Sequence, residues 1–194
     1  MSKTRCLAIK DAILGGKMLA IDPTSGTGDP GKNSQAGWAL FDEGQLLSSG
    51  TIEIPANRDK ATRFRSIQEI LTTQFDETYD VLALEDIPLA RRRGNFSTSQ
   101  TLIQVCGVYI ASTSGELVEL LAHTWQAVAK RIGGWTKGDE SDAQYIGLAA
   151  IAFASGYDQK MSEKRKIEFA AELVDEYDSW GLQTINDHWS ITND

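Results

Sequence analysis

The chain has 194 residues, of which 41% are hydrophobic and 24% are charged, and these proportions favour one folded domain over a disordered chain. Its two cysteines, Cys6 and Cys106, are far apart, which excludes a disulfide framework and a cysteine zinc site. No apolar run reaches the about 18 residues of a membrane helix, and the run after Arg5 is too short for a signal peptide. We therefore expect a cytoplasmic protein without a membrane partner.

The charge of the chain is unevenly distributed. Its 19 Lys and Arg and 27 Asp and Glu residues give a formal net charge of −8, which at first argues against nucleic acid as a partner. The acidic excess falls in residues 138–194, whereas residues 87–137 are basic. Because salt screens charges beyond about 8 Å, a locally basic surface can still contact phosphates. A DNA-binding function is therefore not excluded.

The first half of the chain predicts a strand, a loop, a hairpin and a helix. The apolar residues 18–21 end in Asp22 before a proline, which predicts a buried strand that ends at a loop over residues 23–35. Residues 36–54 predict antiparallel strands joined by a turn at Gly44. Apolar residues then recur at three- and four-residue steps, so we expect an amphipathic helix over residues 58–75.

The second half predicts alternating strands and helices. Residues 80–84 form a second apolar run that ends in Glu85. We expect a helix over 97–114, a strand over 116–122, a short helix or turn over 123–132 and a helix over 139–154, and we expect Ser162 to cap a last helix that runs through Tyr177. This order predicts an α/β fold with a mixed sheet, an antiparallel hairpin followed by parallel strands, and flanking helices.

One motif in the first loop has the spacing of a nucleotide-binding loop. Residues 26–32 match the pattern GxxxxGK. The next residue is Asn33 rather than serine or threonine, and strands rather than a helix are predicted to follow. A phosphate-binding loop needs both the helix N-terminus and the hydroxyl group. We therefore predict no nucleotide cofactor.

Four carboxylates are predicted to meet at one edge of the sheet. Asp22 and Glu85 end two buried strands, and Asp139 and Asp142 are three residues apart on one side of a helix. Taken singly, each could instead be a turn residue, a solvated strand end or a helix cap. Gathered together they would repel one another unless divalent cations neutralise them, and oxygen ligands suit Mg²⁺ or Mn²⁺. Two such ions can hydrolyse a phosphodiester.

Three segments carry a resemblance to a known family. Residues 18–23 (MLAIDP), 82–85 (LALE) and 139–143 (DESDA), in this order, resemble the RuvC-like Holliday junction resolvases of the RNase H-like nuclease superfamily, of a phage-encoded type. The resemblance covers residues 18–156. Residues 1–17 are then an N-terminal extension, and residues 157–194 are a C-terminal helical extension on the same domain.

The resemblance implies an RNase H-like fold and a homodimeric, magnesium-dependent endonuclease. Such an enzyme makes paired symmetric nicks in a four-way DNA junction in its cell's cytoplasm, which is the host's if the protein is phage-encoded. Asp22, Glu85, Asp139 and Asp142 match the family's metal ligands, with two Mg²⁺ per active site and Mn²⁺ as a possible substitute. Asp86 has no match, and the period of a strand turns it away from Glu85.

The resemblance fails at one functional position. In bacterial members an aromatic residue three positions after the strand-end glutamate enters the junction, and Pro88 stands there in this chain. Leu89 or Phe96 could replace it, and the sequence does not decide between them.

Basic residues follow the second acidic strand and precede the last acids. Arg91, Arg92 and Arg93 are predicted to contact DNA phosphates, although a solvated charge run is the alternative. Lys130 and Arg131 resemble the family's late basic residues and are also predicted to bind DNA. Lys137, two residues before Asp139, is predicted to stabilise the charge of the reacting phosphate.

Three alternatives stay open at this point. Metal ligands do not choose a substrate, so the enzyme could cut flaps or RNA/DNA hybrids. A nucleotide-binding protein of the related actin-like fold begins with similar elements, but that fold needs two such units. A catalytically inactive DNA-binding relative is the third. For a dimer, we expect the apolar side of the helix at 97–114, with Val105 and Tyr109, to form part of the interface.

Overall fold

The computed structural model describes residues 3–29, 31–75, 78–86, 96–133, 135–158, 160–166, 168, 169 and 171. The elements in chain order are α1 (Lys3–Gly15), β1 (Lys17–Asp22), β2 (Ser34–Asp42), β3 (Gln45–Ile54), α2 (Lys60–Gln74), β4 (Val81–Asp86), α3 (Phe96–Ser112), β5 (Glu116–Leu121), α4 (Ala122–Ile132) and α5 (Asp139–Ala154). None of the described helices is long and apolar enough to cross a membrane.

The five strands form one mixed sheet in the order β3-β2-β1-β4-β5. Strands β1, β2 and β3 pair antiparallel, and β4 pairs parallel with both β1 and β5. The hairpin turns at Glu43 and Gly44, both with positive φ (49° and 79°), as a two-residue turn of the primed type requires. The predicted α/β fold is confirmed, with a mixed sheet made of an antiparallel hairpin followed by parallel strands, and β2 rather than a helix follows the GxxxxGK segment.

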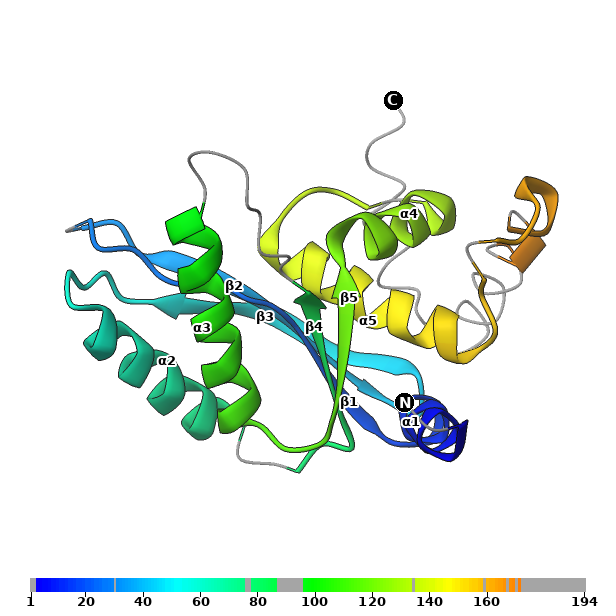
Figure 1. The fold of residues 1–194 in the computed structure, drawn as a ribbon, viewed down its shortest axis with the longest axis horizontal. Coiled ribbons are helices and arrows are strands. Elements are labelled where there is room, and N and C mark those ends of the chain that lie inside the picture. The colour runs from blue at the N-terminus through cyan, green and yellow to red at the C-terminus, as the bar shows by residue number, and fades with distance from the viewer. Residues whose placement is uncertain are drawn as a thin grey trace.

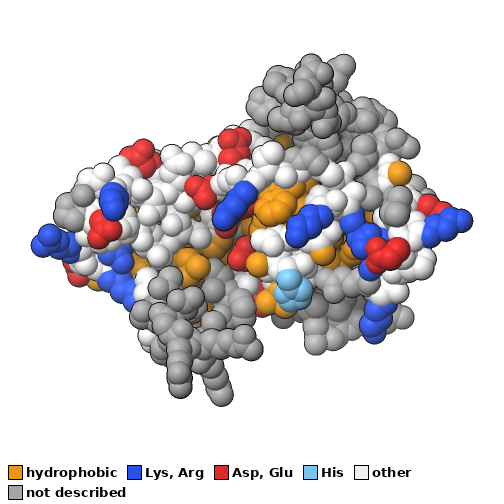
Figure 2. Space-filling view, turned by 90° about the horizontal axis from the view of Figure 1, so that it is seen from above, with side chains coloured by type: hydrophobic (Ala, Val, Ile, Leu, Met, Phe, Trp, Pro, Cys, Tyr) orange, Lys and Arg blue, Asp and Glu red, His pale blue; other side chains and the backbone are white. Residues whose placement is uncertain are grey.

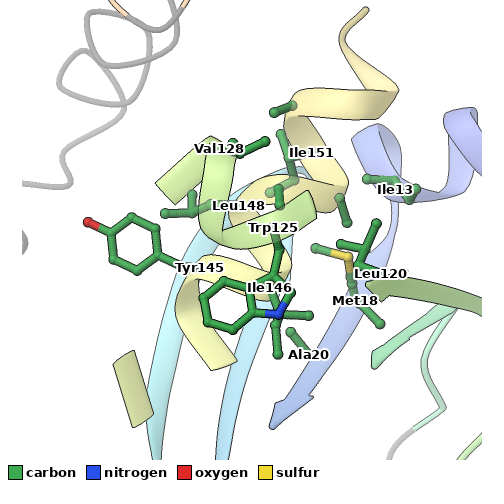
Figure 3. Close-up of a cluster of buried hydrophobic side chains, with 14 of the residues drawn as sticks. Ile13, Met18, Ala20, Leu120, Trp125, Val128, Tyr145, Ile146, Leu148 and Ile151 are labelled. Atoms are coloured by element: carbon green, nitrogen blue, oxygen red, sulfur yellow. The ribbon is translucent and has the colours of Figure 1, made fainter. Parts of the chain in front are cut away.

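Helices cover both faces of the sheet (Figure 1). Side chains alternate along β1, so that Met18 and Ala20 join one buried cluster while Leu19 and Ile21 join the other. The first cluster lies under α1, α4 and α5 and is drawn in Figure 3. The second lies under α2 and α3. The continuous apolar runs of β1 and β4 reflect this burial on both faces.

Helix α5 is the most deeply buried helix of the described chain. Ten of its 16 residues are buried, and it contacts all five strands. Gly147 allows this close packing, because a Cβ there would lie 2.2 Å from the ring of Phe41 on β2. The small residues on α5 therefore set how closely the helix approaches the sheet.

We expect Gly147→Ala to destabilise the protein by about 1–3 kcal/mol, because the added methyl group overpacks the core against Phe41. Urea unfolding followed by circular dichroism measures the change. Gly107→Ala on α3 is the matched control, since a Cβ at Gly107 has no heavy atom within 4 Å. The control should be neutral or stabilising by about 1 kcal/mol, owing to the higher helix propensity of alanine. Equal stability of both variants would contradict the expectation.

Helix α1 and the residues that follow α5 contact the same core. Ile13 of α1 is buried in the cluster under α5, and so are Tyr157 and Phe169. Ser162 accepts a hydrogen bond from the backbone N–H of Arg165 at 3.3 Å, so the predicted cap is present. The later part of the predicted last helix, residues 172–177, lies outside the described residues. Ile13, Tyr157 and Phe169 thus add buried surface to the domain.

The predicted dimer surface on α3 is wrong for its central residues. Val105 and Tyr109 are fully buried in the protein's own core against α2 and the sheet. Ile110 is 37% exposed. The apolar periodicity of this helix reflects packing within the chain, because any helix that covers a sheet needs one apolar face.

Candidate active site

Two strand ends place carboxylates on the same face of the sheet. Asp22 follows Met18 and Ala20, and Glu85 follows Val81 and Ala83, at two-residue steps toward the cluster under α5. The paired residues Ile21 and Leu84 directly precede them, so the two acids end adjacent parallel strands at the same level. Asp86 falls in the alternation with Leu82 and Leu84, which belong to the opposite cluster.

The start of α5 lies directly over β2, next to the end of β1. Gly37 of β2 is the register partner of Asp22. A Cβ on Gly37 would lie 1.6 Å from the carbonyl oxygen of Asp139, a distance at which no side chain fits. The absence of a side chain at Gly37 therefore lets the first turn of α5, with Asp139 and Asp142, approach the end of β1. In Figure 1 the start of α5 lies beside the tip of β4.

Asp22 is the electrostatic centre of this group. Burial, followed by the charges of Asp142, Glu85 and Asp139, raises the pKa of Asp22 from 3.8 to about 8. Burial also raises the pKa of Glu85 and of Asp142, each with a contribution from a neighbouring carboxylate. Three segments far apart in sequence therefore bring four acids within electrostatic range of one another. Such a group favours bound positive charge.

Two tryptophans hold two of the carboxylates. The indole N–H of Trp125 on α4 donates to Oε2 of Glu85 at 2.9 Å. The indole N–H of Trp135, in the loop before α5, donates to Oδ1 of Asp142 at 2.7 Å. Each hydrogen bond acts against the burial effect and lowers the pKa of its carboxyl group. The two rings pack edge to face, with centroids 5.7 Å apart and an interplanar angle of 88°.

The four carboxylates are ligands of the kind that suits a hard divalent cation, although their side chains do not yet lie close together. The four carboxylates form an oxygen-rich group. Because burial and the other three acids raise the pKa of Asp22 to about 8, the group needs a nearby positive charge before all four acids can ionise. Within the described part of the chain, no three His, Cys, Asp or Glu side chains lie close enough to hold a metal ion. Ligation therefore requires the carboxylates to move closer together.

Further contacts fix α5 and the loop before it. Ser49 of β3 donates from its hydroxyl to Oε1 of Glu140 at 2.6 Å, and Gln144 donates to Ser49 Oγ at 2.8 Å. The hydroxyl of Tyr145 donates to the carbonyl of Gly133 at 2.7 Å. Glu140 thus ties the helix to the sheet edge, and it is not among the acids that raise the pKa of Asp22.

The predicted basic residues divide into three groups. Lys137 is exposed, and its charge lowers the pKa of Asp142, so it lies within electrostatic range of the site. Lys130 is exposed near the end of α4, whereas Arg131 forms an ion pair with Glu163. Arg91, Arg92 and Arg93 lie outside the described residues, as do Leu89 and the side chain of Phe96. Figure 2 shows basic and acidic side chains interspersed over one face of the molecule.

Comparisons with known proteins give a likeness of structure and no match of sequence. No protein-family model matches the chain, and no curated protein matches it. Among solved structures, the chain is similar to T. thermophilus RuvC in complex with Holliday junction substrate, with 12% sequence identity and a TM-score of 0.49. The likeness covers 72% of this chain and 96% of that chain. At this level of similarity, the chemistry of the site must be argued from its own residues.

Three residues of the site escaped the sequence analysis. Gly37 carries a detectable signal, because a glycine inside a strand pattern indicates a close backbone approach. Trp125 and Trp135 have no such signal. One lies on the apolar side of a short helix and the other in a loop of small residues, and only the fold brings them to Glu85 and Asp142.

Proposed function

We propose that the protein is a metal-dependent nuclease that cuts branched DNA, with the four-way junction as its preferred substrate. The observation that carries the proposal is the position of Asp22, a half-buried acid at the carboxyl rim of the sheet that lies within electrostatic range of Glu85, Asp139 and Asp142. A folded domain tolerates four acids in mutual range when their combined charge has a use. The resemblance of the three motifs to the Holliday junction resolvases supports the choice of substrate.

Each residue of the site has a proposed role in the reaction. Asp22, Glu85, Asp139 and Asp142 would hold Mg²⁺, or Mn²⁺ in its place, with two ions per site. When bound, such ions activate a water molecule and stabilise the leaving oxygen of a phosphodiester. Lys137, whose charge reaches Asp142, would offset charge on the phosphate under attack. Lys130 would contact the DNA backbone from the end of α4.

The symmetry of the substrate favours a homodimer. A four-way junction offers two equivalent cleavage points, and a two-fold symmetric dimer would present one site to each. Because Val105 and Tyr109 are buried within the chain, the dimer surface must use other residues. Sedimentation analysis with and without junction DNA measures the stoichiometry.

A nicking assay tests the proposed activity. We expect the protein with Mg²⁺ to cut a synthetic four-way junction faster than a Y-fork, a flap or an RNA/DNA hybrid of matched sequence. Asp142→Asn should lower the rate by roughly 10²–10³-fold, because it removes a charge that helps to hold the cation. Denaturing electrophoresis of strands labelled at each end measures both the rate and the symmetry of the nicks.

Asp42→Asn is the matched control for this assay. Asp42 ends β2 opposite Lys17, at the far end of the strand pair from Asp22, so its loss should leave cleavage unchanged. Undiminished cutting by Asp142→Asn would reject the carboxylate assignment. Faster cutting of flaps or hybrids would keep the nuclease but replace the substrate, and no cutting with either Mg²⁺ or Mn²⁺ would reject the enzyme altogether.

A further inference from the structure

The two tryptophans at the site form a continuous link between two carboxylates from different elements. Glu85 is at the end of β4, and Asp142 is in the first turn of α5. Between them, Trp125 and Trp135 each donate an indole N–H to one carboxylate oxygen and contact each other edge to face. Each hydrogen bond is of normal length and runs from a neutral donor to an acid that can carry charge.

The link is anchored in the core rather than in solvent. Trp125 is 1% exposed, and Trp135 packs against the same hydrophobic cluster. An indole has one donor and no acceptor, so each ring can serve one carboxylate oxygen only. Oε2 of Glu85 and Oδ1 of Asp142 thereby each use one lone pair to accept a hydrogen bond from the protein. The other oxygen of each carboxylate, Oε1 of Glu85 and Oδ2 of Asp142, is then the candidate for binding a cation.

We propose that Trp125 and Trp135 are positioning residues that orient Glu85 and Asp142 for a divalent cation, an inference that rests on the proposed function. Hydrogen bonds to the unused oxygens of ligating carboxylates restrict their rotation, and losing such a partner lowers metal affinity by about 10–100-fold. The edge-to-face contact makes the two orientations interdependent, because one ring cannot shift without moving against the other.

Calorimetric titration with Mn²⁺ tests the proposal without relying on activity. We expect Trp135→Phe, which keeps a ring but removes the N–H group, to raise the dissociation constant for Mn²⁺ by about 10–100-fold. Trp125→Phe should act in the same direction. In the junction assay, both variants should need correspondingly more Mg²⁺ for half-maximal cutting and should approach the wild-type rate at saturating Mg²⁺. A role in packing alone would not move the metal requirement.

Trp38→Phe is the matched control, because its indole Nε1 is buried with no hydrogen-bond partner among the described residues. Trp38 contacts Phe75 in the opposite cluster, so the control also loses an indole but should bind Mn²⁺ as the wild type does. If Trp125→Phe fails to fold, Trp135→Phe, whose ring is only partly buried, decides alone. Wild-type Mn²⁺ affinity in Trp135→Phe would overturn the proposal.

The titration also separates this inference from the proposed nuclease function. Wild-type protein that binds Mn²⁺ with the expected loss in Trp135→Phe, but cuts no DNA, would support the positioning role and reject the nuclease. Wild-type protein that does not bind Mn²⁺ would overturn the positioning role. If the protein cuts DNA but the tryptophan variants bind Mn²⁺ as tightly as the wild type, the nuclease function would be supported and the positioning role rejected.

Discussion

We expect Asp22→Asn to lose cleavage and gain stability at the same time. Cleavage should fall by roughly 10³-fold, because the variant removes the acid that lies within electrostatic range of all three others. Stability should rise in metal-free protein at high pH, because the same acid is costly to ionise in its half-buried position beside other carboxylates. Opposite changes in activity and stability are typical of a residue kept for function.

The sign of the pH dependence follows from the raised pKa. Asp22 has an ordinary pKa of 3.8 when exposed in the unfolded chain and a pKa of about 8 in the metal-free folded protein. Below pH 4 the group is protonated in both states and has no effect. As pH rises toward 8, the unfolded chain releases the proton and the folded protein retains it, so folding stability falls. Above pH 8 the loss is complete.

Unfolding in denaturant at pH 5 and pH 9, with a chelator present, measures this effect. We expect Asp22→Asn to exceed the wild type by roughly 2–4 kcal/mol at pH 9 and by much less at pH 5. Added Mg²⁺ should narrow the gap at pH 9 by stabilising the wild type alone. Asp42→Asn should show neither change. A wild type that is equally stable at both values of pH would contradict the raised pKa.

The second large effect is expected for Gly37→Ala. The new methyl group would overlap the carbonyl group of Asp139, and a backbone atom cannot turn aside as a side chain does. The start of α5 must then move away from β2, which takes Asp139 and Asp142 away from Asp22. We expect a destabilisation of about 3 kcal/mol or more, at the upper end of overpacking effects, and loss of cleavage even in the fraction that stays folded.

Thermal unfolding and the junction assay, carried out well below the melting temperature, separate the two losses. Gly50→Ala is the matched control, because Gly50 lies in the neighbouring strand and the three heavy atoms nearest to a Cβ there all belong to the ring of Trp38, at 3.2 Å. That ring can shift, so the control should lose little stability and no activity. Full cleavage by folded Gly37→Ala would show that the placement of α5 does not depend on this glycine.

The elements and the rim of carboxylates could be predicted because their signals are local. Alternation and apolar runs assign strands, and an acid at the end of a buried run lies at a strand end whatever the fold. The period of two was enough to separate Glu85 from Asp86, which the structure places in alternation with opposite clusters. To predict that Asp139 and Asp142 lie near Asp22, the topology of the fold was also needed. The order of the three motifs along the chain indicated that topology.

The features that the sequence did not predict correctly are contacts between helices, strands and loops. The apolar face of α3 was expected at a dimer interface, yet Val105 and Tyr109 cover the sheet of their own chain. Periodicity shows that a face is buried and does not show by what. The bonds from Trp125 to Glu85 and from Trp135 to Asp142 join residues 40 and 7 positions apart, and no sequence pattern specifies such a pair.

The deep burial of α5 has a consequence for how the site can fail. Helix termini usually fray before the rest of a domain unfolds, but the first turn of α5 rests on Gly37 and carries half of the acids. Opening that turn would expose the apolar residues that follow it. The amide protons of Asp142 and Ala143 should therefore exchange with solvent only when the whole domain melts, and the constellation of acids should persist intact up to that point.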